Sequence, residues 1–199
     1  MKNPSSKPRR RGIYFLPNLL TTGALCSGFF AIVAATQNWF DWAAYAILLS
    51  MLLDGIDGRV ARWTNTQSDF GAEYDSLSDM VSFGVAPALI IFEFALNQMG
   101  KVGWVAAFIY TAAAALRLAR FNTQVGIADK RYFQGLASPS AAAIVTFYVW
   151  VADRYLPEHA SINVIAVLLT IMAGVLMVSN IRYHSFKGFD FRARVPFVG

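Results

Sequence analysis

The chain has 199 residues, of which 56% are hydrophobic and 15% are charged, and its formal net charge is +5. About a quarter of the residues are charged in an ordinary soluble domain, so this composition excludes that class and suits one compact membrane bundle. A positive net charge can also indicate a nucleic-acid-binding protein, but the positions of the basic residues, described below, argue against one.

The residues before the first apolar segment form a basic stretch, residues 1–15, in which arginines are mixed with Ile13, Tyr14 and Phe15. Such a stretch can lie at the headgroup level as an amphipathic anchor, or it can be a disordered tail, and the sequence does not choose between the two. The apolar segment that follows is too long for the core of a signal peptide. We therefore expect it to remain as the first transmembrane helix.

Six apolar segments are each long enough to cross a bilayer, which takes about 20 mostly apolar residues in a helix. We expect an all-α integral membrane protein with six transmembrane helices at residues 16–37, 42–62, 71–96, 102–121, 136–155 and 162–183. The second and third segments are apolar for only part of their length. In the first segment we expect Cys26 to be a buried, unreactive thiol. One domain then covers residues 16–183, followed by a basic tail at residues 184–199.

Nearly all lysines and arginines fall on one side of the membrane if the six segments alternate in direction. The opposite side holds only Lys101 and Arg154. Because cytoplasmic loops carry the excess of basic residues, both termini are predicted to be cytoplasmic. The same distribution accounts for the net charge without a nucleic-acid partner.

Acidic residues cluster where the second apolar segment ends and the third begins. Their pattern is Asp54-x-x-Asp57-Gly58-x-x-Ala61-Arg62, eight further residues, and then Gly71-x-x-x-Asp75-x-x-x-Asp79. Residues three or four apart share a helix face, so a turn at residues 64–68 would point two pairs of carboxylates at each other. Charged groups inside a membrane span are costly and are usually functional.

Four neighbouring carboxylates repel one another unless cations lie between them. Mg²⁺ and Mn²⁺ suit oxygen ligands, and two such ions about 4 Å apart can hold the attacking and leaving oxygens of a phosphoryl displacement. Asp54 lies about 12 residues into its segment, or ~18 Å, which places the cluster near the cytoplasmic face. The cluster predicts phosphoryl transfer on a lipid diphosphate. A capping and ion-pair cluster is the structural alternative, but four aspartates are too many for capping.

This pattern resembles the signature of the CDP-alcohol phosphatidyltransferases at every position, and the six-helix layout is similar to that family as well. The resemblance implies that Asp54, Asp57 and Asp75 bind metal, and that Asp79 is both a ligand and the general base on the acceptor hydroxyl. It also implies a homodimer. The residues that it assigns to the CDP-lipid are Asn18, Thr21, Gly58, Ala61, Arg62 and Gly71.

The acceptor alcohol is indicated by three further stretches, which resemble the bacterial and archaeal members that make phosphatidylserine: residues 71–88, 116–122 and 132–143. We therefore expect transfer of the phosphatidyl group from CDP-diacylglycerol to L-serine, with release of CMP. Arg117 and Arg120 share a helix face and can bind a carboxylate, and Gln134 and Ser138 can orient the ammonium group. The arginines can equally follow the positive-inside rule, or hold a phosphate-bearing acceptor such as glycerol 3-phosphate or an inositol phosphate.

A cation-coupled transporter is the alternative from another functional class. It is disfavoured because the acids lie at one face rather than at the midplane, and no inverted repeat is evident. Three acids keep open roles: Asp69 and Glu73 lie beside the cluster, where they can support it or simply face water. Glu93 lies inside the third segment and can face another subunit or reach toward the interface.

Overall fold

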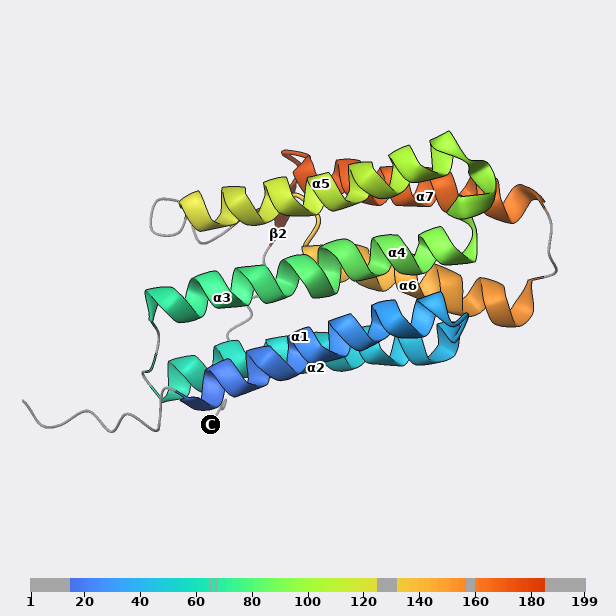
Figure 1. Cartoon of the computed structure of the whole chain (residues 1–199). Coiled ribbons are helices and arrows are strands. Elements are labelled where there is room, and N and C mark those ends of the chain that lie inside the picture. The colour runs from blue at the N-terminus through green and yellow to red at the C-terminus, as the bar shows by residue number, and fades with distance from the viewer. Residues whose placement is uncertain (1–14, 65, 67, 125–131, 157–159, 185–199) are drawn as a thin grey trace, which may run out of the picture.

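The computed structural model describes residues 15–64, 66, 68–124, 132–156 and 160–184. These residues contain six long helical segments, which lie side by side (Figure 1). Five of the segments are single helices: α1 (Phe15–Thr36), α2 (Phe40–Trp63), α5 (Lys101–Gln124), α6 (Ser138–Tyr155) and α7 (Ala160–Val178). The other segment runs without a break through α3 (Asp69–Asp79), the π-helix η2 (Met80–Val85) and α4 (Ala86–Phe94), and a short 3₁₀ turn, η3 (Leu96–Met99), follows it.

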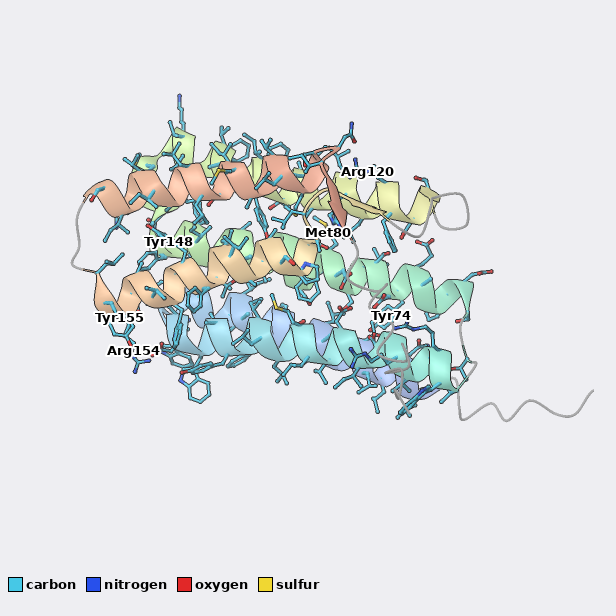
Figure 2. The ribbon with its side chains drawn as sticks, turned by 180° about the vertical axis from the view of Figure 1, so that it is seen from behind. Tyr74, Met80, Arg120, Tyr148, Arg154 and Tyr155 are labelled. Carbon is cyan, nitrogen blue, oxygen red and sulfur yellow. The ribbon has the colours of Figure 1, made fainter. Side chains whose placement is uncertain are left out.

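Three layers make up the bundle, as both views show (Figures 1 and 2). The pair α1 and α2 forms one outer layer, and the pair α5 and α7 forms the other. The continuous α3–α4 segment and α6 lie between them. This arrangement puts the segment that carries half of the predicted aspartates in contact with the helices on either side.

The helices match the predicted apolar segments to within a few residues, except at the end of the last one. There α7 ends at Val178, and the short strand β2 (Arg182–His184) pairs antiparallel with β1 (Tyr132–Gln134), a pairing that was not predicted. Among the described residues, four helical stretches are long and apolar enough to cross a membrane: Leu16–Thr36, Asp69–Phe94, Lys101–Thr123 and Ser161–Val178. Residues 1–14 of the predicted amphipathic anchor lie outside the described residues, as does the predicted basic tail beyond residue 184.

Small residues and interhelical hydrogen bonds hold α1 against α2. The Ser27 hydroxyl donates to the Ala46 carbonyl at 2.7 Å, and the Ser50 hydroxyl donates to the Ala24 carbonyl at 2.9 Å. Between lipid-embedded helices the hydrophobic effect is weak, so close backbone contact and such hydrogen bonds provide much of the packing energy. The two helices therefore pack closely, and α3 lies against α1.

The third helical segment is fixed on α1 at one crossing point. A methyl group added at Gly28 would lie 2.8 Å from Ser82 Cα, so only glycine allows this approach. Two hydroxyls bridge the same interface, from Ser78 to the Thr21 carbonyl at 3.2 Å and from Ser82 to the Ala24 carbonyl at 3.3 Å. These contacts set the height of α3, and of its aspartates, relative to α1.

The outside of the bundle is apolar, with large side chains such as Phe29, Leu52, Phe147 and Leu168 about three-fifths exposed, at 61%, 64%, 61% and 62%. Much of the interior is alanine. This distribution requires an apolar solvent, as a bilayer provides. The expectation for Cys26 was wrong, because its side chain is exposed on this outer surface. Apolar residues face lipid as well as core in a membrane bundle, so apolar sequence alone did not predict burial.

Labelled side chains identify the two ends of the bundle. Arg120 and Tyr74 lie at one end, and Arg154 and Tyr155 lie at the other (Figure 2). Arg154 forms an ion pair with Asp41, with 3.8 Å between Nη1 and Oδ1, which links α6 to the start of α2. The chain thus alternates in direction as the sequence predicted, and the aspartate-bearing ends of α2 and α3 lie at the Arg120 end.

Candidate active site

Three aspartates from two helices meet at the Arg120 end of the bundle. Asp54 and Asp57 come from α2 and Asp75 comes from α3, and one carboxylate oxygen of each lies within 4.8 Å of those of the other two. The i, i+3 spacing on α2 places its pair on one face. The approach of the two helices that the sequence predicted is therefore present for these three residues.

Asp79, the fourth aspartate of the pattern, lies one turn deeper, at the end of α3. Its carboxyl group lies next to that of Asp54. The fourth carboxyl group is thus joined to the group of three through Asp54. In the next residue the backbone changes from α-helix to π-helix.

Thr21 on α1 belongs to the aspartate cluster. Its hydroxyl donates to Asp57 Oδ2 at 2.7 Å and also lies 3.1 Å from the Pro17 carbonyl oxygen. Thr21 is buried, with 4% of its surface exposed, as is Asp57, also at 4%. The sequence placed Thr21 toward the nucleotide. In the structure the residue also orients one of the aspartates.

The oxygen atoms present fit a divalent metal ion. Asp75 Oδ1 is buried and has no hydrogen-bond partner among the described residues. A buried carboxylate oxygen without a partner is costly, and hard divalent cations bind such oxygens. Asp54, Asp57 and Asp75 would hold the ion, and Asp79 lies next to Asp54.

The residues assigned to the CDP-lipid lie along the ends of α1, α2 and α3. A methyl group added at Gly58 would meet nothing within 4 Å, so there is open space beside α2. Asn18 lies beside Gly71, because a methyl group added at Gly71 would be 3.6 Å from Asn18 Oδ1. Arg62 is exposed, and its Nε donates to the Gly58 carbonyl at 2.9 Å. Ala61, half-buried, precedes it on α2.

The residues assigned to the acceptor lie on α5, β1 and α6. Arg120 Nη1 donates to the Val178 carbonyl at 3.3 Å and to Asn180 Oδ1 at 3.2 Å, so this guanidinium ties α5 to the end of α7. Arg117 lies one turn earlier on α5 and is half-buried. Ser138 is buried at the first position of α6. Gln134 lies in β1, and its side chain is outside the described residues.

Sequence reasoning missed a link between the aspartates and α5. The Ser76 hydroxyl donates to Asn122 Oδ1 at 3.0 Å. Ser76 follows Asp75 directly, and Asn122 lies two residues beyond Arg120. Asn122 ends the stretch at residues 116–122 that indicated the acceptor, which is the signal that pointed toward it. The bond connects α3, next to Asp75, to α5, near Arg120.

A second missed contact lies on the side of α3 that faces α1. The Tyr74 hydroxyl lies 2.9 Å from Thr22 Oγ1, and the Tyr74 ring stacks on Phe70 with 6.0 Å between centroids. Two of the acids with open roles, Asp69 and Glu73, are both exposed on the same helix. Asp69 occupies the first turn of α3, where a negative charge interacts favourably with the helix dipole.

Comparison with known proteins gives the same family that the sequence pattern resembled. The sequence model of CDP-alcohol phosphatidyltransferase matches residues 14–181. A CDP-diacylglycerol–serine O-phosphatidyltransferase of Helicobacter pylori is 39% identical over 175 residues, which are 88% of this chain and 74% of that protein. The enzyme of the same name from Methanocaldococcus jannaschii is 41% identical over 140 residues, 70% of this chain and 62% of that protein. An archaetidylserine synthase of Methanothermobacter thermautotrophicus is 34% identical over 175 residues, 87% of this chain and 71% of that protein.

Proposed function

The chain belongs to the CDP-alcohol phosphatidyltransferase family, and from this premise we propose that it transfers the phosphatidyl group of CDP-diacylglycerol to the hydroxyl group of L-serine. The products are phosphatidylserine and CMP. The observation that carries this proposal is the group of three carboxylate oxygens, from Asp54, Asp57 and Asp75, within 4.8 Å of one another. Such a group suits a metal-assisted reaction of a diphosphate.

Serine is the acceptor that the relatives favour. Their names differ in the lipid part, phosphatidyl or archaetidyl, but share serine. A phosphate-bearing acceptor such as glycerol 3-phosphate should need more convergent cationic groups than serine does.

The four aspartates are the proposed ligands for two ions, Mg²⁺ or Mn²⁺. Bound divalent ions would supply positive charge at the diphosphate, where negative charge develops during the reaction. The unpaired Asp75 Oδ1 supports this assignment. The family generally uses divalent metals, and the oxygen ligands alone do not select between the two ions.

In the proposed reaction Asp79 accepts the proton of the serine hydroxyl as the general base. The serine oxygen then forms a bond to the phosphorus that bears the diacylglycerol. The bond from that phosphorus to the bridging oxygen breaks, and CMP leaves with the electron pair. Arg62 is proposed to stabilise the leaving phosphate. Direct transfer is favoured over a covalent intermediate, because the described residues near the cluster include no Ser, Cys or His paired with a base.

Binding roles follow from the positions of the remaining residues. The open space beside Gly58, with Ala61 one turn further on, is the proposed place of the cytidine, and Asn18 and Gly71 line the same end. Thr21 is also proposed to line the CDP-lipid, and its hydroxyl holds Asp57. For the acceptor, Arg117, Arg120, Gln134 and Ser138 remain the proposed serine-binding residues, with Ser76 and Asn122 linking them to the aspartates.

The proposed topology has six transmembrane helices, so that α2 and α6 cross the membrane together with the four stretches that have the length and hydropathy of a span. Both termini and the active site face the cytoplasm, at the inner membrane. This orientation is supported by Arg62, in the last turn of α2, and by Arg120 at the aspartate end. Residues 1–15 are proposed as an interfacial segment, residues 16–183 as the catalytic domain and residues 184–199 as a basic tail. The active form is proposed to be a homodimer.

The test is CMP release by purified protein in detergent, with CDP-diacylglycerol and Mg²⁺ or Mn²⁺. L-Serine, glycerol 3-phosphate and an inositol phosphate are added in turn. Release with serine alone is the expected result. Release with another acceptor would keep the aspartate chemistry and discard the acceptor assignment. If folded protein releases no CMP with any of them, the transferase proposal fails and a transporter has to be considered.

A further inference from the structure

The backbone widens into a π-helix immediately after Asp79. The π-helix covers Met80–Val85, and the Ala86 N–H donates to the carbonyl of Val81, five residues earlier, rather than four. Such turns are rare, and they often occur at functional sites. A π-turn changes the angle between the residues before and after it, so this one helps to set the direction in which Asp79 points from the end of α3.

Pro87, the second residue of α4, leaves one carbonyl of this segment without its usual partner. In an α-helix the Phe83 carbonyl would accept from the N–H of residue 87, but proline has none. The Tyr110 hydroxyl, from α5, donates to the Phe83 carbonyl at 3.0 Å. A side chain of another helix thus supplies the donor that the sequence removed. Similar repair of backbone groups freed by proline occurs in other membrane helices.

Tyr110 is held firmly in this position. It is fully buried, at 0% exposed, and α7 packs directly behind it, because a methyl group added at Gly174 would lie 3.2 Å from Tyr110 Cα. Within the π-helix, a methyl group added at Gly84 would lie 3.0 Å from Met80 Sδ and 3.2 Å from the Cβ of Ala114, which is on α5. The π-helix is therefore packed tightly against α5, and Met80 lies in the middle of the bundle (Figure 2).

We propose that Tyr110 is a positioning residue: its hydrogen bond to the Phe83 carbonyl keeps the segment after Asp79 in the π-helical form and so aims the Asp79 carboxyl group at the aspartate cluster. The role in catalysis rests on the proposed function, but the effect on the geometry of the cluster does not. A change at Tyr110 would alter the cluster through Asp79 and its neighbour Asp54.

The test compares Tyr110→Phe with Tyr148→Phe. Both variants remove a tyrosine hydroxyl that donates to a backbone carbonyl on another helical segment, since Tyr148 donates to the Ile162 carbonyl at 2.7 Å. Tyr148 lies away from the aspartates, toward Arg154 and Tyr155 (Figure 2). Two quantities are measured on intact protein in detergent: Mn²⁺ affinity by electron paramagnetic resonance, and kcat and KM for CMP release.

For Tyr110→Phe we expect about tenfold weaker Mn²⁺ binding and a kcat lower by about 100-fold, since small misplacements of reacting groups have effects of that size. The KM values should change little. Tyr148→Phe should leave both quantities unchanged. Equal behaviour of the two variants would overturn the proposal. Mn²⁺ binding can be measured without turnover, so the Mn²⁺ result tests the role of Tyr110 even if the proposed function is wrong. The proposed function itself is overturned if the unaltered protein releases no CMP with serine.

Pro87→Ala decides the matter if Tyr110→Phe does not fold. This variant gives residue 87 an N–H that can donate to the Phe83 carbonyl, in competition with Tyr110, and so favours ordinary α-helix over π-helix. We expect unchanged or higher thermal stability together with weaker Mn²⁺ binding and lower kcat. A Pro87→Ala protein with full Mn²⁺ affinity and full kcat would show that the π-helix does not position Asp79.

Discussion

The hydroxyl group of Thr21 lies 2.7 Å from Asp57 Oδ2, although 36 residues separate the two in the chain. A threonine on α1 thus fixes the orientation of a carboxylate on α2, and the same stretch of α1 accepts a hydrogen bond from Ser78 on α3 through the Thr21 carbonyl. Residues behind a metal ligand commonly set its rotamer and strengthen its binding. The first helix is therefore part of the aspartate centre.

Thr21→Val should weaken metal binding. Valine has nearly the shape of threonine but has no hydroxyl, so Asp57 would lose its hydrogen-bond donor and turn more freely. We expect about tenfold weaker Mn²⁺ binding, measured by titration and by the Mn²⁺ concentration that gives half-maximal CMP release. Thr21→Ser keeps the hydroxyl and should restore most of the affinity. If the serine variant were as weak as the valine variant, packing rather than the hydrogen bond would be responsible.

Asp57→Asn should abolish CMP release while the protein still folds and inserts. Asparagine matches aspartate in size, but it removes one negative charge from the group formed with Asp54 and Asp75. We expect activity to fall by about a thousandfold, the size of effect seen when a key electrostatic group is removed. The matched control is Asp69→Asn, which changes an exposed aspartate in the first turn of α3. Normal turnover by Asp57→Asn, with a normal gel-filtration profile, would refute the metal assignment.

The sequence predicted the helices well because apolar length and charge placement act locally along the chain. It also predicted that α2 and α3 would bring Asp54, Asp57 and Asp75 together, since i, i+3 and i, i+4 spacing determine a helix face. It could not predict the contacts of Thr21 or Arg120, because those depend on which helices become neighbours. The π-helix after Asp79 was also missed. Pro87 was a signal for it, but the donor to the Phe83 carbonyl comes from Tyr110 on another helix, which the sequence does not show.

Gly28→Ala should destabilise the fold, because the added methyl group would lie 2.4 Å from Ser82 Oγ and 2.8 Å from Ser82 Cα. The backbone contact cannot relax by a simple side-chain rotation, so we expect a loss of about 1–3 kcal/mol. Thermal unfolding in detergent measures it. Gly55→Ala is the control, since a methyl group there meets nothing within 4 Å, and it should be neutral or stabilising by up to ~1 kcal/mol. Equal midpoints for the two variants would contradict the close crossing of α1 and η2.

Arg120→Ala should raise the KM for serine more than the KM for CDP-diacylglycerol. A charged hydrogen bond to a carboxylate contributes about 1.5–3 kcal/mol, which corresponds to at least a tenfold change in KM. A change confined to the KM for CDP-diacylglycerol would indicate that this arginine binds CDP-diacylglycerol rather than serine.

The contact of Arg120 with the end of α7 offers a second explanation for such a loss, because the residue could act by tethering α7. Asn180→Ala separates the two explanations. It removes one partner of Arg120 Nη1 on the α7 side, at 3.2 Å, and keeps the guanidinium group. If Arg120 binds serine directly, Asn180→Ala should leave the serine KM near its normal value. If both variants raise the serine KM to the same extent, Arg120 acts on the acceptor through the position of α7.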